Sequence, residues 1–226
     1  MNEGSERRVH EPAAERAWRG LALAYAAGLG ATILYANRAF YHDDAYITLR
    51  YARNLIDGAG VVWNPGEYVQ GYTNFLHLLL VSGLGWLGID LVVASRVVGV
   101  AALLSLVVLL FIWSRRADAE SRSGLGHVPV ILVMTSAPML VWSVGGLEGT
   151  LFSALVTAGC LLFLLGLEGR MGISAFIASG VCLAGSFLTR PDGIVFLSLS
   201  VCWSLLDRRS GQKRWDLIGF LGGAAL

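Results

Sequence analysis

Charged residues are scarce in this 226-residue sequence: they make up 15% of it, against about 25% in typical soluble domains. The formal net charge is only +1, which excludes the strong basic excess of a nucleic-acid-binding protein.

Cysteine is also rare. An odd count of three, all inside apolar runs, excludes a disulfide framework and favours packing roles for Cys160, Cys182 and Cys202. The four histidines do not have the spacing of a zinc motif, so no metal site of that kind is predicted.

Long apolar runs are what the sequence has instead. Hydrophobic residues make up 55% of it and the mean hydropathy is +0.63. A helix that crosses a bilayer needs about 20 predominantly apolar residues. We therefore predict an all-α, polytopic membrane bundle. Its apolar runs cover residues 20–37, 73–89, 91–113, 128–145, 150–167, 172–188, 193–206 and 217–226.

The run 73–89 decides the topology, because it is short and contains Asn74 and His77. If this run lies at the outer interface, 12 of the 17 Lys and Arg residues face the cytoplasm; if it spans, 11 of the 17 lie outside. The positive-inside rule favours the first arrangement. We predict about six full spans and a partial seventh, in the plasma membrane, with a cytoplasmic N-terminus.

This topology divides the chain into a cytoplasmic basic leader (1–19) and a transmembrane domain (20–226). An outer loop, 38–90, is expected to hold a short amphipathic helix near 46–57 and the apolar interfacial helix 73–89. The last run, 217–226, gives about 15 Å of helix, too short for a hydrocarbon core of about 30 Å. We expect the chain to be the N-terminal portion of a longer protein or a truncated copy.

Acidic side chains converge on the predicted outer face. Asp43 and Asp44 lie in the long loop, Glu148 in a Gly-Leu-Glu-Gly turn, and Asp192 in a Thr-Arg-Pro-Asp-Gly turn. Loops that meet at one end of a rigid scaffold are where binding sites are usually built. The adjacent carboxylates of Asp43 and Asp44 can share a proton or a divalent cation. Alternatively, Asp43 caps the short helix that follows it.

Arginines near these acids are candidates for binding an anion. Arg50 and Arg53 share one side of the predicted short helix and suit phosphate oxygens; the alternative is pairing with Asp57 or lipid headgroups. Arg190 suits an anion too, unless it only bridges to Asp192 within its turn. Other polar groups suit sugar hydroxyls, although turns and helix caps explain several of them equally well. These are Tyr46, Asn64, Glu67, Tyr72, Thr73 and Asn74.

The longest distinctive string is DDAYITLRYARNLIDGAGVVWNPGEYVQGYTNFL, which follows a signal-anchor helix and precedes GLEGTLF and LTRPDG. In this order the strings resemble the GT-C-fold membrane glycosyltransferases that use polyprenyl-phosphate sugars. Within that family, the sequence is most similar to the mycobacterial terminal arabinofuranosyltransferase type.

The resemblance implies an enzyme that moves a sugar, arabinofuranose in that type, from a polyprenyl-phosphate carrier to a cell-envelope glycan at the outer membrane face. It also implies that an acidic residue in the first outer loop is catalytic, and the matching positions are Asp43 and Asp44. Either would serve as general base for the acceptor hydroxyl. The pair of carboxylates would also permit a covalent, retaining route, and the sequence does not choose between inversion and retention. Arg190, together with Arg50, would stabilise the phosphate leaving group.

Two other functions stay open at this point. A transporter or flippase of lipid-linked sugars would place ionisable residues near the membrane midplane. Here such residues gather at the predicted outer face, which favours interfacial chemistry. The other alternative is an inactive, truncated membrane fragment.

Overall fold

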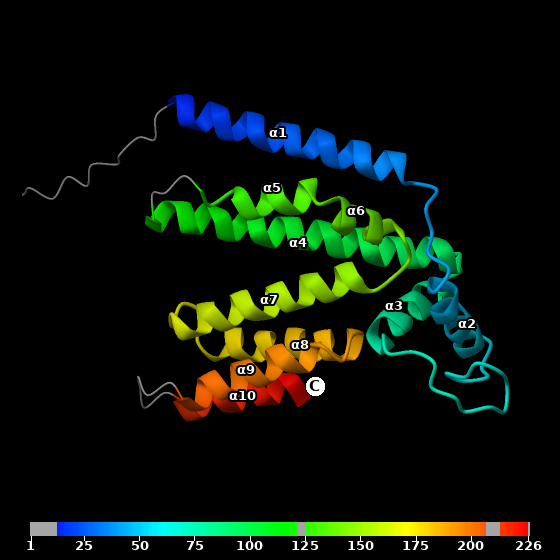
Figure 1. The fold of residues 1–226 in the computed structure, drawn as a ribbon. Coiled ribbons are helices and arrows are strands. Elements are labelled where there is room, and N and C mark those ends of the chain that lie inside the picture. The colour runs from blue at the N-terminus through cyan, green and yellow to red at the C-terminus, as the bar shows by residue number, and fades with distance from the viewer. Residues whose placement is uncertain (1–12, 122–124, 207–212, 226) are drawn as a thin grey trace, which may run out of the picture.

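The computed structural model describes residues 13–121, 125–206 and 213–225 (Figure 1). This part of the chain folds into helices without a strand, and one isolated β-bridge joins Asn64 and Glu67. The helices are α1 (Ala13–Ala36), α2 (Ala45–Ile56), α3 (Phe75–Trp86), α4 (Leu91–Ser121), α5 (Val128–Thr135), α6 (Ala137–Val144), α7 (Gly149–Leu167), α8 (Ile173–Thr189), α9 (Gly193–Leu206) and α10 (Lys213–Ala225).

The connections between the long helices alternate between two ends of the bundle (Figure 1). The end of α1, helices α2 and α3, the start of α4, the α6–α7 turn and the α8–α9 turn all lie at the right of Figure 1. We call this the polar end. The start of α1, the end of α4 and the α7–α8 turn lie at the opposite end. The segment between α1 and α4, which includes α2 and α3, therefore lies at the polar end, and α3 does not run the length of the bundle. That residues 38–90 form an outer loop stays a prediction.

Three helices are long and apolar enough to cross a membrane: Ala17–Ala36, Leu91–Ala119 and Gly149–Leu167. Shorter apolar helices cover Phe75–Trp86, Ile173–Thr189 and Gly193–Leu206. This composition confirms a polytopic helical membrane bundle, while the number of six spans stays a prediction. The 12 residues of α3 extend only about 18 Å, less than a hydrocarbon core of about 30 Å.

The predicted single helix 128–145 is wrong, because the structure divides it into α5 and α6. Ser136 is extended, with φ −73° and ψ 100°, and a proline follows at the start of α6. Pro138 has no N–H to donate to the carbonyl of Met134, four residues back, so it cannot continue α5. Helix α1 packs at this break, where a Cβ on Gly30 would lie 2.6 Å from the Met134 oxygen.

Two other boundaries differ from those predicted. Helix α1 begins at Ala13, inside the predicted leader, because Ala13, Ala14 and Ala17 are strong helix formers and the charged residues between them also favour a helix. Helix α4 continues to Ser121, beyond the predicted end at 113. Residues 1–12 of the leader lie outside the described part of the chain. The division into leader and transmembrane domain stays a prediction.

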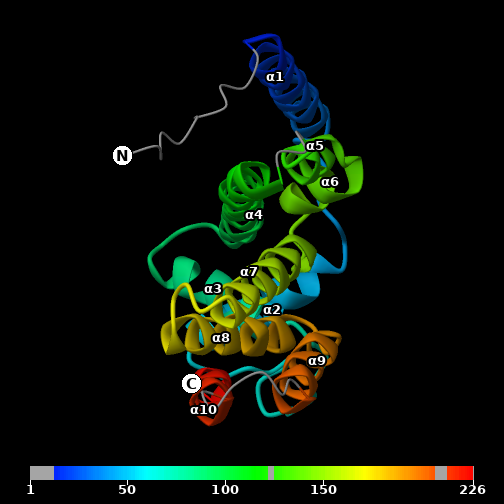
Figure 2. The ribbon, with the colours of Figure 1, turned by 90° about the vertical axis from the view of Figure 1, so that its left-hand side faces the viewer.

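Two of the three apolar clusters among the described residues join three helices each. Phe163, Phe176, Leu183 and Phe220 join α7, α8 and α10. The second cluster joins α2, α3 and α4 around Leu49, Ala52, Val81, Leu91, Ala94 and Val98. Figure 2 shows α1, α5 and α6 at one side and α8, α9 and α10 at the other, with α4 and α7 between them. The second cluster fixes α2 at the polar end, where the candidate site lies.

Candidate active site at the polar end

The segment after α1 is anchored on the α6–α7 turn. The backbone N–H of His42 donates to the carbonyl of Gly145 at 3.0 Å. The ring of Phe40 packs edge-on against Trp142, with centroids 5.8 Å apart. Gly146 has φ +89°, and a Cβ there would lie 2.5 Å from the Tyr41 ring. These contacts place Asp43 and Asp44 beside the turn that carries Glu148.

Asp43 and Asp44 are exposed, with 93% and 68% of their side chains accessible. Asp44, not Asp43, occupies the N-cap position of α2, and its side chain makes no capping bond. The Asp43 carboxylate accepts the N–H of Asp44 at 3.0 Å. The alternative that Asp43 caps α2 is therefore wrong, because the chain turns one residue later than expected. Both carboxylates are open to a substrate.

His42 joins this acidic pair. Its Nδ1 lies 3.1 Å from Oδ1 of Asp43 and 3.7 Å from Oδ2 of Asp44. One ligand atom from each of the three residues lies within 4.8 Å of the others. Carboxylate oxygens and an imidazole nitrogen are ligands that divalent cations accept. His42 was not among the predicted site residues, although its place directly before Asp43 was a usable signal.

A chain of polar contacts links four helices next to this pair. Nδ2 of Asn74 donates to Oγ1 of Thr48 at 2.9 Å and to Oε2 of Glu148 at 3.1 Å. Nη1 of Arg190 donates to Oε1 of Glu148 at 2.9 Å, and its Nε donates to Asp192 at 3.3 Å. We call this the Glu148 chain: Thr48, Asn74, Glu148, Arg190 and Asp192. It brings together four of the predicted site residues.

The Glu148 chain answers two questions that the sequence left open. The side chain of Asn74, at the N-cap of α3, makes no capping bond and instead holds Glu148. Arg190 does bridge to Asp192, and it also pairs with Glu148 in another helix. Glu148 is only 8% exposed, whereas 43% of the Arg190 side chain is accessible. Arg190 thus has a fixed inner partner and faces outward with N–H donors left over.

Two buried polar residues behind Glu148, His77 and Thr150, were not predicted as site residues. His77 is fully buried, and neither of its ring nitrogens has a hydrogen-bond partner among the described residues. Oγ1 of Thr150 and Oδ1 of Asn74 are also buried without a described partner. Burial lowers the pKa of His77 from 6.5 to about 4, and the nearby negative charge of Glu148 opposes this only in part. The i, i+3 spacing of Asn74 and His77 was the available signal.

A third group of predicted residues organises the loop between α2 and α3. Arg50 donates through Nε to the carbonyl of Trp63 at 2.8 Å and through Nη2 to Oδ1 of Asn64 at 2.6 Å. Asn64 in turn donates to Glu67 at 2.8 Å. The hydroxyl of Tyr51 donates to the carbonyl of Val69 and accepts the N–H of Gly71. In the structure, Arg50, Asn64 and Glu67 bind one another and fix this loop on α2.

The remaining predicted residues lie in separate places. Tyr46 is 56% exposed, and its ring contacts Tyr41 edge-on at 5.1 Å. Tyr72 packs against Tyr51, with ring centroids 4.9 Å apart. Thr73 is exposed beside Asn74. The structure therefore gathers Asp43 and Asp44 near the Glu148 chain, while Tyr72 and Thr73 border the loop.

Comparisons with known proteins give one informative match. No family model matches the chain, and no solved structure matches it. Over 198 residues, 82% of its length, the chain is 29% identical to a terminal beta-(1->2)-arabinofuranosyltransferase of Mycobacterium tuberculosis. It spans 31% of the length of that relative. The match confirms that this chain is similar to a mycobacterial terminal arabinofuranosyltransferase, the type that its sequence resembles.

Proposed function

We propose that this chain carries the catalytic end of a membrane glycosyltransferase. In this proposal a sugar, arabinofuranose by analogy with the relative, moves from a polyprenyl-phosphate carrier to a cell-envelope glycan at the outer membrane face. The observation that carries the proposal is that two exposed carboxylates, Asp43 and Asp44, and an ion pair between the buried Glu148 and the accessible Arg190 lie at the same end of an apolar bundle. The relative's name supports the class of reaction.

The carboxylates supply the proton acceptor in this proposal. The acceptor hydroxyl attacks the anomeric carbon, a new C–O bond forms, and the bond from that carbon to the phosphate oxygen breaks. The hydroxyl proton passes to Asp43 or Asp44, and the bond electrons leave with the lipid phosphate. A carboxylate exposed at a membrane border can reach a water-borne acceptor, which the buried Glu148 cannot.

Arg190 is our candidate for the leaving phosphate. Its outer partner Asp192 is 67% accessible, so that contact contributes little and is easily exchanged for a phosphate oxygen. The inner contact with Glu148 keeps the guanidinium oriented while its other N–H donors face outward. A divalent cation held by His42, Asp43 and Asp44 would add positive charge at the same place. Arg50 is less suited, because the loop already occupies its Nε and Nη2.

No observation favours the transporter alternative. In the candidate spans Leu91–Ala119 and Gly149–Leu167, ionisable side chains lie near the ends: Arg96 at the start of α4, and Arg115, Arg116 and Asp118 at its end. Glu148 precedes α7. A transport path across the membrane needs polar groups at the midplane.

The test is transfer of labelled sugar from a polyprenyl-phosphate donor by membranes that contain this chain. The Asp43→Asn/Asp44→Asn variant should lose transfer at equal expression. Asp57→Asn is the matched control, because it makes the same change at an exposed aspartate after the other end of α2. If the double variant transfers sugar as well as the wild type does, the catalytic assignment is wrong.

A further inference from the structure

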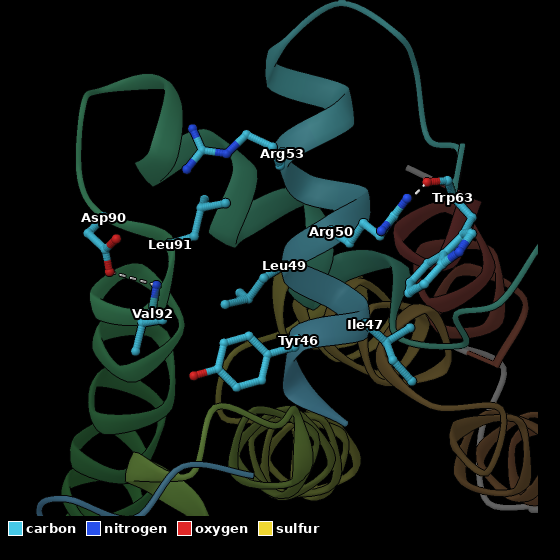
Figure 3. Close-up of a pocket in the computed structure, with 9 residues that line it drawn as sticks. All are labelled: Tyr46, Ile47, Leu49, Arg50, Arg53, Trp63, Asp90, Leu91 and Val92. Atoms are coloured by element: carbon cyan, nitrogen blue, oxygen red, sulfur yellow. Dashed lines mark hydrogen bonds between the residues drawn. The ribbon is translucent and has the colours of Figure 1, made fainter. Parts of the chain in front are cut away.

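A pocket of about 470 Å³ opens between α2 and the start of α4, apart from the Glu148 chain (Figure 3). Its size falls within the range of about 300–1,000 Å³ that is usual for small-ligand sites. It combines apolar side chains, among them Leu49 and Leu91, with the polar side chains of Tyr46, Arg50, Arg53 and Asp90.

Three polar groups of this pocket have capacity to bind a ligand. The Arg53 side chain is exposed and makes no hydrogen bond or ion pair with the rest of the described chain. Asp90 uses one carboxylate oxygen, Oδ1, to accept the N–H groups of Val92 and Val93 at 3.0 and 3.1 Å. Its other oxygen is left for a ligand. The Tyr46 hydroxyl points towards the α4 side of the pocket (Figure 3).

The floor of the pocket is apolar and rigid. Leu49 and Leu91 are 7% and 6% exposed, and both belong to the cluster that joins α2, α3 and α4. The rim is fixed as well, because the guanidinium of Arg50 stacks 4.4 Å from the Trp63 ring while it holds the loop backbone. The binding surface is therefore formed before any ligand arrives, which reduces the entropy cost of binding.

This mixture of groups suits a neutral polyol better than a phosphate. A carboxylate in the lining repels an anion, whereas it accepts hydrogen bonds from hydroxyl groups. A guanidinium donates to sugar oxygens, and a phenol does both. The apolar floor matches the C–H face of a sugar ring. Arg53 alone suits phosphate, but Asp90 across the pocket opposes that ligand.

The pocket adjoins the candidate catalytic pair. Tyr46 lies three residues after Asp43, and its backbone N–H donates to the Asp43 carbonyl at 3.0 Å. A ligand against Tyr46 is thus about one helical turn from the carboxylates.

We propose that this pocket binds a neutral sugar ring of the glycan acceptor, held by Arg53, Asp90 and Tyr46. This inference rests on the proposed function, because it assigns the acceptor of that reaction.

Two variants test the assignment by kinetics. Arg53→Gln removes the charge at similar length, and Asp90→Asn keeps an oxygen that can accept the Val92 N–H. Each should raise KM for the acceptor roughly 10-fold, as expected for a lost charge-assisted hydrogen bond. KM for the lipid-linked donor should not change. Arg115→Gln is the matched control, an exposed arginine 25 residues further along α4 than Asp90. An unchanged acceptor KM in both variants overturns the proposal.

Direct binding separates this inference from the proposed function. The probe is a synthetic, lipid-free arabinofuranosyl oligosaccharide, added to the purified full chain in nanodiscs and followed by saturation-transfer NMR. Binding to the wild type and to Arg115→Gln, but not to Arg53→Gln or Asp90→Asn, supports the pocket even if no sugar is transferred. Absence of binding to the wild type, or equal binding to all four proteins, overturns it.

Inorganic phosphate is the competing probe in the same experiment. Saturable phosphate binding that requires Arg53 and excludes the oligosaccharide would overturn the sugar assignment in favour of an anion site. Gel filtration and thermal unfolding of Asp90→Asn establish that the start of α4 is intact, so that lost binding reports on the pocket itself.

Discussion

Nη1 of Arg190 lies 2.9 Å from Oε1 of Glu148, and this ion pair joins two turns that are 42 residues apart in the chain. The Glu148 carboxylate is buried, and its other oxygen binds Asn74. The pair therefore fixes the α8–α9 turn against α3 and α7 at the polar end, so each partner is expected to depend on the other for stability.

Removing either partner of this pair should destabilise the bundle. Glu148→Gln and Arg190→Gln are each expected to lower the free energy of unfolding by about 1–3 kcal/mol, the cost of leaving a buried or half-buried polar group unmatched. Because the residues are in contact, the double variant should lose less than the sum of the single variants, with a coupling of about 0.5–3 kcal/mol. Unfolding by SDS titration in mixed micelles measures these free energies, and the coupling follows from the four proteins of the cycle. Strict additivity would contradict the pairing.

His77 should make the stability of the protein depend on pH, so that the free energy of unfolding decreases when the pH is lowered. The unfolded chain takes up a proton near pH 6.5, whereas the buried side chain does so only near pH 4. The unfolded state therefore binds more protons between these values, and stability decreases as the pH falls from about 6.5 towards 4. The loss is on the order of 3 kcal/mol at pH 4. Above pH 6.5, His77 contributes no pH dependence.

The matched variant for this effect is His77→Leu, which replaces the neutral imidazole with an apolar side chain that cannot take up a proton. Unfolding curves recorded in steps between pH 7 and 4 should be flatter for His77→Leu than for the wild type. The variant changes no other residue, so the difference between the two curves isolates His77. Identical slopes would show that His77 is not buried as described.

Gly146 is expected to tolerate no side chain. Gly146→Ala would combine a φ of +89° with a Cβ 2.5 Å from the Tyr41 ring, a conformational and steric cost of about 1–3 kcal/mol. The displacement of Tyr41 should also disturb Asp43 and Asp44, so transfer activity should fall with stability. Gly149→Ala is the control, because nothing lies within 4 Å of a Cβ there and α7 begins at that residue. Equal effects would contradict the role of Tyr41.

An ion cluster at the opposite end supports a fourth prediction. Asp118 of α4 binds Nδ1 of His127 at 2.9 Å, the N–H of Gly126 at 2.8 Å and Arg19 of α1 at 3.4 Å. Asp118→Asn weakens these charge-assisted contacts and should lower stability by about 1–2 kcal/mol. Since this end is far from Asp43, transfer activity per folded molecule should be unchanged. A selective loss of activity would contradict this separation.

Periodicity made most of the helices predictable. The apolar runs located α4, α7, α8 and α9 within a few residues, except at the end of α4. Which end of the bundle faces the outside of the membrane stays a prediction from the charge count. The break at Ser136 was not seen, because the apolar run continues through it and the backbone effect of Pro138 was not weighed. Apolar runs report burial, whereas helix continuity depends on individual N–H groups.

The candidate site was predictable as a set of residues but not as a set of contacts. The outer turns supplied Asp43, Asp44, Glu148 and Arg190, since charges in an apolar sequence are conspicuous. Thr48 and Thr150 were missed because hydroxyl residues within helices are common and carry no charge. Which groups pair depends on how α2, α3, α7 and α8 pack, and no spacing along the chain encodes that.

The long sequence separation within the Glu148 chain has a consequence for biosynthesis. At a synthesis rate of about 5–20 residues per second, Arg190 leaves the ribosome roughly 2–8 seconds after Glu148, its partner 42 residues earlier. During that interval the turn before α7 carries a carboxylate without its arginine partner. The final assembly of the polar end therefore waits until the helical hairpin of α8 and α9 has been synthesised and has folded.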